Sequence, residues 1–238
     1  TVARARASHE RPNLVFVLLD TLRADRPSAY GYERPTTPRL AELAARGTLF
    51  EEAHASSSWT WPSVASLFTG LAPEQHGVGD AVHSFLPEHL ETLAETLQRA
   101  GFSTAGWSGS PLIVPAKQFD QGFEFFDASR AGFLRRAELV VPPALDWLER
   151  VRGQRFFLYL HLMETHAPYI PLERARRAFA PEVPSDFDAY DMLAWQWDLR
   201  RTGFDAAGNA RTDAIVPATK RRWVSDLYDA CVWSADHW

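Results

Sequence analysis

Strand-like apolar runs alternate with amphipathic stretches along this chain. The runs cover residues 13–19 (NLVFVLL), 102–107 (FSTAGW) and 155–162 (RFFLYLHL). The first and last are typical of strands buried on both faces of a parallel sheet. Helical patterns cover residues 38–46, 62–69, 91–100, 143–152 and 218–238. The alternation predicts an α/β fold with a mostly parallel central sheet flanked by helices.

Turn and cap residues set the expected boundaries of several elements. Thr37 and Pro38 mark the start of the first helix and Gly47 marks its end, while Gly70 ends the second helix. A short strand is expected at 48–50, directly after the first helix.

The composition and the net charge exclude some classes of binding partner. The 238 residues are 46% hydrophobic, which is enough for a packed core. The chain has 25 Lys and Arg against 30 Asp and Glu, a net charge of −5, and so has no general attraction for nucleic acid or anionic membranes. No apolar run approaches the ~20 residues that a transmembrane helix needs. We therefore expect no nucleic-acid partner and no transmembrane segment.

Segment composition divides the chain into a tether and one domain. Residues 1–11 (TVARARASHER) are basic and lack the apolar stretch of a signal peptide, so we interpret them as a tether. Residues 12–238 form the domain, and the shift to Pro, Asp, Arg and Gly over about 174–219 indicates an excursion packed on the sheet edge. The single cysteine, Cys231, excludes an intrachain disulfide and a multi-cysteine metal site, and we assign it to packing.

Asp20 is the first residue with candidate chemistry. It ends the first predicted strand, and ligands of open α/β sheets collect at the carboxyl ends of strands. A carboxylate there, with Thr21 beside it, is well positioned to hold a divalent cation. The alternative is that Asp20 only caps the following turn.

Thr60 is a candidate nucleophile in SWTWPSVASLFTG (58–70), two residues before a proline that is expected to begin a helix. Backbone N–H groups and the positive end of the helix dipole suit a hydroxyl that attacks an anionic ester. The alternative is that Ser58 or Thr60 only caps the helix, and the segment taken alone favours this alternative.

Two histidines, His161 and His166, lie in HLMETHAP (161–168), at the end of a predicted strand. They can converge on one pocket, where an imidazole binds an anionic oxygen or protonates a leaving group. A lone histidine is more often structural.

Asp236 and His237, another pair of possible ligands, lie on the last helix and are assigned to its surface.

Taken together, these segments resemble the sulfatase family, within the alkaline phosphatase superfamily. The likeness begins with RPNLVFVLLDTLRADRPSAYGYERPTTPRLAELAARGTLFEEAHASSSWTWPSVASLFTGLAPEQHGV. It continues through GFSTAGW, FDQGFEFFD, HLMETHAPYIP and YDACVWSADHW, so it covers about residues 11–238. The resemblance implies an α/β sandwich that hydrolyses sulfate esters or related phosphoesters. It also implies a divalent metal ion, calcium first, with zinc or manganese as alternatives.

The resemblance also implies roles for single residues. Asp20 would be a metal ligand, and Thr21 stands where many members have a second liganding aspartate. Thr60 stands at the nucleophile position, which the metal also contacts. His166 matches a histidine that contacts the ester group, and His161 is kept as a further catalytic candidate.

Departures from the family pattern change the expected chemistry. Thr60 cannot become formylglycine, because that modification acts on cysteine or serine. Val64 replaces the arginine of the modification motif, and WSGSPL (107–112) lacks the lysine and histidine that the family often has there. Threonine nucleophiles occur in superfamily relatives that cleave phosphodiesters or transfer phosphoryl head groups. The overall likeness therefore indicates sulfate esters, whereas the local chemistry favours phosphoesters.

The resemblance predicts a second metal motif, an Asp-His or Asp-Asn pair, after a strand that follows the last helix. The chain ends at Trp238 without it, so we interpret the chain as the N-terminal portion of the domain, incomplete at its C-terminus and inactive by itself. The full-length protein is expected to be a hydrolase of small-molecule or glycan sulfate or phosphate esters. The alternatives are a non-catalytic member that binds anionic glycans and a phosphoryl head-group transferase. The family also implies a periplasmic or extracellular location.

Overall fold

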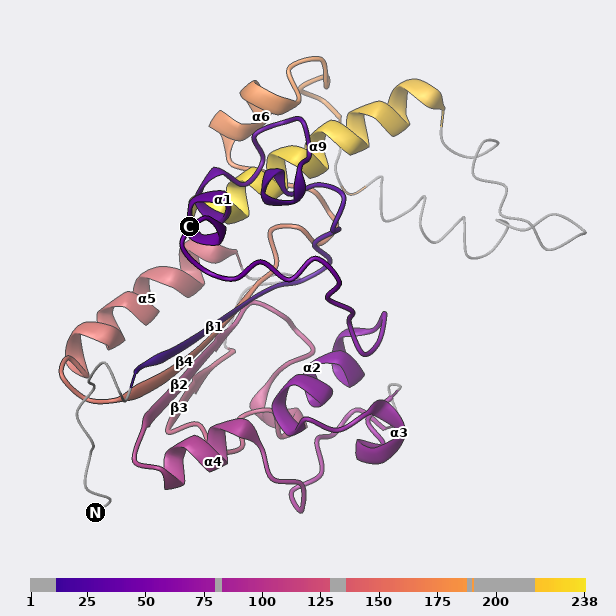
Figure 1. The fold of residues 1–238 in the computed structure, drawn as a ribbon. Coiled ribbons are helices and arrows are strands. Elements are labelled where there is room, and N and C mark those ends of the chain that lie inside the picture. Colours follow the sequence, from indigo (N-terminus) through magenta and orange to yellow (C-terminus); the bar gives the residue numbers. More distant parts are fainter. Residues whose placement is uncertain (1–11, 80–82, 129–135, 188–189, 191–216) are drawn as a thin grey trace, which may run out of the picture. The chain divides into compact units, whose positions relative to one another are not determined.

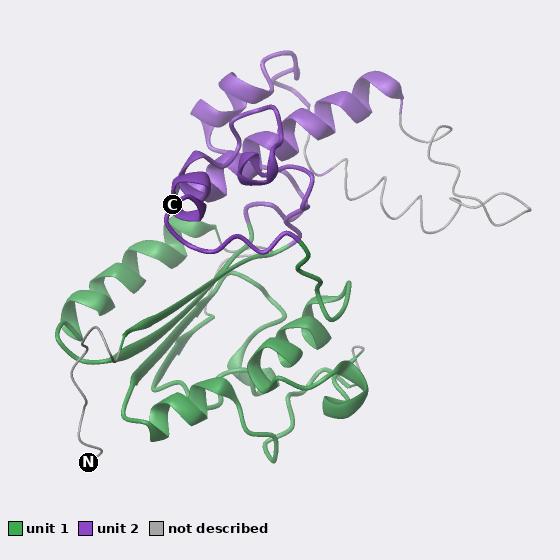
Figure 2. Cartoon of the chain, in the orientation of Figure 1, with its two compact units in different colours: residues 1–20, 52–163 green, residues 21–51, 164–238 purple. Residues whose placement is uncertain are grey.

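The computed structural model describes residues 12–79, 83–128, 136–187, 190 and 217–238 (Figure 1). The chain divides into two compact units, Thr1–Asp20 with Glu52–Met163 and Thr21–Glu51 with Glu164–Trp238 (Figure 2). The predicted tether at 1–11 and most of the predicted excursion at 174–219 lie outside the described residues. Each unit has its own clusters of buried hydrophobic side chains.

A sheet with the strand order β1-β4-β2-β3 forms the centre of the first unit (Figure 1). The strands are β1 (Leu14–Leu19), β2 (Ser103–Ser108), β3 (Phe125–Asp127) and β4 (Phe156–Leu162), and they pair in parallel. The strands predicted at 13–19, 102–107 and 155–162 agree with β1, β2 and β4 to within one residue. The predicted burial of the first strand on both faces is wrong, because β1 is the end strand of the described sheet and Val15 and Val17 are 56% and 49% exposed. The predicted α/β fold with a mostly parallel sheet is confirmed, and β3 is an addition that the sequence did not indicate.

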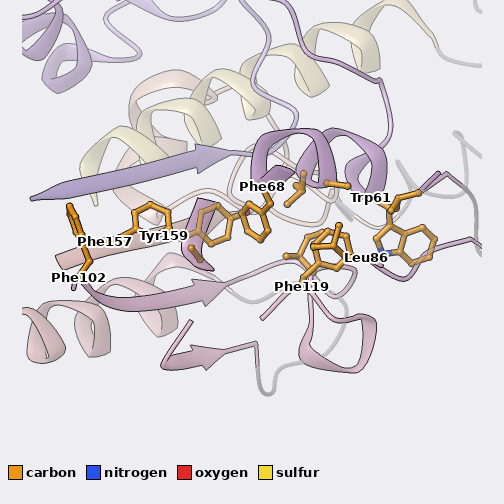
Figure 3. Close-up of a cluster of buried hydrophobic side chains, with 12 residues drawn as sticks. Trp61, Phe68, Leu86, Phe102, Phe119, Phe157 and Tyr159 are labelled. Atoms are coloured by element: carbon orange, nitrogen blue, oxygen red, sulfur yellow. The ribbon is translucent and has the colours of Figure 1, made fainter. Parts of the chain in front are cut away.

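Helices cover both faces of this sheet. One face carries α2 (Thr60–Thr69) and α4 (Leu93–Arg99), with α3 (Pro73–His76) and the 3₁₀ turn η2 (Pro115–Lys117) in the same unit, and the other carries α5 (Ala137–Arg150) (Figure 1). Side chains alternate along a strand. Phe157 and Tyr159 join the cluster under α2, shown in Figure 3, whereas Leu158 and Leu160 join the cluster under α5. Burial on both faces explains why β4 is a continuous apolar run.

Two helices begin earlier than their prolines suggest. α2 begins at Thr60 rather than at Pro62, which the first turn of a helix tolerates. It ends as predicted at Gly70, which has a φ of 70°. α5 begins at residue 137 rather than at Pro143, because the residues before the proline contribute to its buried apolar face.

The predicted strand at 48–50 is wrong. These residues are irregular, and Phe50 is 70% exposed. A strand needs a hydrogen-bonded neighbour, and none of the strands in the described ranges pairs with this segment.

The second unit is helical. It contains the 3₁₀ turn η1 (Ser28–Tyr30), α1 (Pro38–Ala44), α6 (Glu173–Phe179) and α9 (Ala218–His237), and both α1 and α6 contact α9. The helices predicted at 38–46 and 218–238 are therefore confirmed. Cys231 is buried in α9, as its assignment to packing requires. None of the described helices combines the length and the apolar character needed to cross a membrane.

Asp236 joins the last turn of α9 to the first turn of α1. Its carboxylate accepts hydrogen bonds from the backbone N–H groups of Arg39 and Leu40, both at 2.8 Å. Asp236 is 8% exposed, so its predicted surface position is wrong. Thr37 is the N-cap residue as predicted, but its side chain makes no capping hydrogen bond. The long-range carboxylate takes over that task.

Candidate functional site

The carboxyl ends of β1 and β4 lie side by side. The parallel register pairs Leu18 with His161 and Leu19 with Leu162. The ladder continues one residue further, because the Asp20 N–H donates to the Leu162 carbonyl at 3.0 Å. Asp20 therefore lies at the carboxyl edge of the sheet, as the sequence predicted, where ligands of open α/β folds collect.

Asp20 and His161 share one face of the sheet. Because side chains alternate along a strand, Asp20 follows Leu18 on its face of β1, and His161 follows Tyr159 on its face of β4. Leu18 packs against the same hydrophobic cluster that contains Tyr159. This is the face that α2 covers, and α2 begins at Thr60.

The Thr60 hydroxyl lies next to the carboxylate of Asp20. Its Oγ1 donates to Oδ2 of Asp20 at 3.4 Å, which is longer than an ideal hydroxyl–carboxylate bond. The N-cap of α2 is Trp59, which makes no side-chain cap, so neither Ser58 nor Thr60 caps this helix. The first residue of a helix also lies beside backbone N–H groups that have no partner within the helix. The Thr60 hydroxyl is thus close both to a carboxylate and to the positive end of a helix.

His161 contacts the same carboxylate. Its Nε2 lies 3.0 Å from Oδ2 of Asp20, and its Nδ1 lies 3.1 Å from the hydroxyl of Tyr159. The side chain of His161 is fully buried and that of Asp20 is 10% exposed. The structure therefore brings together three of the predicted site residues, Asp20, Thr60 and His161, all within the first unit.

Tyr159 is the member of this group that the sequence analysis missed. Burial, together with the negative charge of Asp20, raises the pKa of Tyr159 well above its usual value, so the side chain remains a phenol. Its ring packs edge-on against Phe68 of α2, with the centroids 5.0 Å apart (Figure 3). The available signal was the spacing of two polar-tipped side chains, Tyr159 and His161, on one face of an otherwise apolar strand.

Val64 lies on α2, one turn after Thr60. It is 1% exposed and belongs to the hydrophobic cluster under α2. The side chain at this position therefore contributes packing and supplies no positive charge.

Thr21 and His166 belong to the second unit. The Thr21 hydroxyl donates to the Thr165 carbonyl at 2.8 Å, and Nδ1 of His166 donates to the Ala167 carbonyl at 2.6 Å. Thr21 has a φ of 56°, a left-handed conformation that is unfavourable for a β-branched residue and easier for aspartate or asparagine.

The described residues supply only part of a metal site. Asp20 and Thr60 offer oxygen atoms, the donors that calcium prefers. Across the described ranges, no three His, Cys, Asp or Glu side chains gather in a way that could hold a metal ion. Nε2 of His161 contacts Asp20. These residues therefore do not fit a complete divalent-metal site by themselves.

Comparison with known proteins identifies similar sequences. The family profile described as Sulfatase matches residues 12–236. An N-acetylglucosamine-6-O-sulfatase from Bacteroides thetaiotaomicron is 25% identical over 206 residues, which are 76% of this chain and 36% of that enzyme. The chain thus spans about a third of the length of this curated relative.

Solved structures with a similar fold include proteins of several activities. The phosphonate monoester hydrolase of Agrobacterium radiobacter has a TM-score of 0.69 and 17% identity, over 95% of this chain and 57% of that one. The soluble domain of lipooligosaccharide phosphoethanolamine transferase A from Neisseria meningitidis has a TM-score of 0.62 and 20% identity, over 98% and 62%. The C-terminal periplasmic domain of EcEptC from Escherichia coli, in complex with Zn, has a TM-score of 0.62 and 17% identity, over 99% and 57%. At these identities the likeness establishes the fold alone.

Proposed function

This chain belongs to the sulfatase family, and we propose that the complete protein hydrolyses sulfate or phosphate esters with Thr60 as the nucleophile. The observation that carries the proposal is the 3.4 Å hydrogen bond from the Thr60 hydroxyl to Oδ2 of Asp20. This pair lies at the carboxyl edge of a parallel sheet and at the first residue of a helix. Both features favour an anionic substrate.

The proposed reaction takes place in two displacements at Thr60. In the first, Oγ1 bonds to the sulfur or phosphorus atom, the bond to the ester oxygen breaks, and the hydroxyl proton passes to Oδ2 of Asp20. The departing alcohol takes up a proton from solvent. In the second, water attacks the threonyl ester, Asp20 returns its proton to Oγ1, and one proton of the water passes to solvent. The product is inorganic sulfate or phosphate from a monoester, and a phosphate monoester from a diester.

The identity of the nucleophile favours phosphoesters within this class. A threonine cannot form the formylglycine aldehyde, so the threonyl ester has to be cleaved by direct attack of water or another acceptor. The buried Val64 supplies no positive charge one turn along α2. Family membership supports sulfate esters, and the fold of the phosphonate monoester hydrolase supports phosphorus chemistry. Phosphate diesters and monoesters are therefore the first substrates to test, beside aryl sulfates.

A divalent ion is part of the proposal for the complete protein. When bound, it would neutralise negative charge on the transferring group. Asp20 and Thr60 would offer oxygen ligands, and Thr21 is kept as a third candidate on the resemblance. Calcium suits oxygen donors, whereas the Zn complex among the similar structures supports zinc. The ester-contacting role of His166 likewise follows from the resemblance.

The test replaces Thr60 in the complete protein. Thr60→Ala removes the nucleophile and Thr60→Ser keeps a hydroxyl. Thr69→Ala is the matched control, because the Thr69 hydroxyl donates to the Ala65 carbonyl of its own helix at 2.7 Å. Each variant is assayed on an aryl sulfate, a phosphate monoester and a phosphate diester, with calcium, zinc or manganese. We expect Thr60→Ala to lose about 10³-fold or more in kcat, and Thr69→Ala to lose little. Full turnover by Thr60→Ala would overturn the assignment.

A phosphoryl transferase is the second candidate. The hydroxyl nucleophile and the fold shared with the phosphoethanolamine transferase favour it. A threonyl phosphate can pass its group to an acceptor alcohol as well as to water. Adding an acceptor alcohol to the diester assay distinguishes the two, because a transferase forms a new phosphate diester that contains the acceptor, whereas a hydrolase forms only the phosphate monoester. A glycan-binding member without catalysis would turn over none of the three substrates.

Substrate size and location complete the proposal. The curated relative is named for a sugar sulfate, which supports small-molecule or glycan esters as substrates. The periplasmic domain among the similar structures supports export to the periplasm or beyond. Cell fractionation of the complete protein tests the location, and recovery in the cytosol alone would contradict it.

A further inference from the structure

We propose that His161 is a positioning residue: Tyr159 fixes its imidazole as the Nε2–H tautomer, and Nε2–H holds the carboxylate oxygen of Asp20 that also receives the Thr60 hydroxyl. Four side chains then form one hydrogen-bonded series, Tyr159 to His161 to Asp20, with Thr60 on the same oxygen. This inference rests on the proposed function only for its kinetic consequences. The tautomer itself is a property of the folded chain.

The backbone sets this series in place. β4 is the central strand between β1 and β2, so both sides of His161 are fixed by ladder pairs, Leu18 on one side and Ser108 on the other. In addition, the Gly109 N–H donates to the His161 carbonyl at 2.8 Å. A side chain on so constrained a backbone has little freedom to move relative to Asp20 on the neighbouring strand.

The chemistry of the partners determines the tautomer. An ionised carboxylate only accepts hydrogen bonds, so the nitrogen that faces Oδ2 of Asp20 has to carry the hydrogen, and this nitrogen is Nε2. In a neutral imidazole the other nitrogen, Nδ1, is then an acceptor. Tyr159, which remains a phenol, donates its hydroxyl hydrogen to Nδ1 at 3.1 Å. Each donor in the series therefore faces an acceptor.

Burial decides between a positioning role and direct contact with substrate. His161 and Tyr159 have no exposed surface, and both ring nitrogens of His161 are engaged within the first unit. An ester that approaches from solvent meets Thr60 and the 10% exposed carboxylate of Asp20 instead. His161 thus acts through Asp20, by fixing the rotamer of the carboxylate and occupying one lone pair of Oδ2. Groups that orient a reacting or ligating carboxylate in this way typically affect activity by about 10–100-fold.

The first measurement concerns the tautomer and needs no substrate. Long-range ¹H–¹⁵N spectra of the histidine-labelled complete protein distinguish a protonated Nε2 from a protonated Nδ1. The signal of His161 is assigned by its loss in His161→Gln. We expect protonated Nε2 and unprotonated Nδ1 in the wild type, and a changed Nδ1 signal in Tyr159→Phe. A protonated Nδ1 in the wild type would overturn the proposal, whether or not any ester is turned over.

The second measurement is kinetic and includes a rescue. His161→Gln keeps an amide N–H near the place of Nε2, whereas His161→Leu removes every donor. We expect kcat/KM to fall about 10–100-fold in His161→Leu and about tenfold in Tyr159→Phe, and to recover most of the loss in His161→Gln. If folded His161→Gln is as impaired as His161→Leu, the proposal is wrong. If His161→Leu does not fold, the other two variants still test the proposal. Wild-type kcat/KM in Tyr159→Phe would show that the hydrogen bond from Tyr159 to His161 has no effect on Asp20, and so would contradict the proposal.

A second buried histidine of the same unit provides the matched control. His76 is 3% exposed, and its two ring nitrogens contact the Ser66 hydroxyl and the Val78 N–H at 3.1 and 3.0 Å. It therefore resembles His161 in burial and in having two partners, but its partners include no carboxylate. His76→Gln should leave kcat/KM of the folded protein unchanged. If kcat/KM falls equally in His76→Gln and His161→Leu, the loss comes from replacing a buried histidine and not from the contact with Asp20, and the proposal is wrong.

Discussion

The hydroxyl of Thr60 and the carboxylate of Asp20 lie 3.4 Å apart although 40 residues separate them in the sequence. The first residue of α2 and the residue that follows β1 meet because α2 covers the face of the sheet on which Asp20 projects. The hydroxyl of Thr60, the negative charge of Asp20 and the first residue of a helix therefore lie close together. The proposed ester chemistry depends on this pair more than on any other contact of the first unit.

Neutralising Asp20 tests the part that its charge plays. Asp20→Asn keeps the size of the side chain but cannot accept the Thr60 proton, so kcat/KM for the best ester should fall by about 10²–10⁴-fold. Asp146→Asn, an exposed position on α5, is the control and should leave kcat/KM unchanged. Steady-state kinetics on the complete protein measure both. Activity within a few-fold of wild type in Asp20→Asn would remove Asp20 from the mechanism.

Asp229 should be the most sensitive charged position of the second unit. It is fully buried and accepts hydrogen bonds from Arg34 at 2.6 Å, Arg26 at 3.1 Å and the Tyr32 hydroxyl at 2.8 Å. Asp229→Ala leaves two partly buried guanidinium groups without this partner. We expect it to lower the free energy of unfolding by about 3 kcal/mol, as removal of one side of a buried ion pair does.

Asp226 on the same helix provides the comparison for Asp229. It contacts Arg34 at 2.8 Å but is 19% exposed, so solvent screens its charge. Asp226→Ala should therefore cost about 1 kcal/mol or less. Denaturant unfolding of both variants measures the difference in the free energy of unfolding. Equal decreases would show that the burial of Asp229 does not make its ion pairs more stabilising than that of Asp226.

The pH dependence of stability should report on His76. Burial lowers the pKa of His76 below its usual value of about 6.5, an effect that the charge of Glu74 partly opposes. The unfolded chain then binds a proton more readily than the folded chain, so the free energy of unfolding should decrease as the pH falls from about 7 through 6.5 toward the lower folded-state pKa. Protonation of Nδ1 would also break its hydrogen bond from the Val78 N–H.

Two variants isolate this contribution. His76→Gln should flatten the fall in stability below about pH 7, because glutamine does not titrate. His54→Gln removes a histidine that is 83% exposed and should leave the slope as it is in the wild type. Urea unfolding at a series of pH values measures both, and an unchanged slope in His76→Gln would contradict the assignment.

The strands and the edge of the sheet could be predicted because their signals are local. The apolar runs at 13–19 and 155–162 match β1 and β4, and the polar residue after the first run, Asp20, lies at the carboxyl edge. The predicted starts of α2 and α5 were wrong, because a proline in the first turns of a helix does not determine the residue at which the helix begins. The expected strand at 48–50 has no neighbour with which to pair.

Contacts between distant segments could not be predicted from local patterns. Asp236 caps α1 across 197 residues, and no pattern near either segment indicates that contact. Tyr159 was missed for a related reason: a tyrosine in an apolar strand is ordinarily part of the core, and its hydroxyl gains a role only because His161 follows on the same face. The sequence indicated candidate residues, whereas the order in which they are hydrogen-bonded depends on the fold.

The most direct test of the central claim is to trap the covalent intermediate on Thr60. The complete protein is mixed with its best ester, quenched in acid within the first turnovers, digested and analysed by mass spectrometry. The account predicts that the peptide containing Thr60 gains the mass of the transferred group, a sulfuryl or phosphoryl group with the second ester substituent retained when the substrate is a diester. Fragmentation should locate this group on Oγ1, with no such gain in Thr60→Ala. A modified residue other than Thr60 in the active wild-type protein would contradict it.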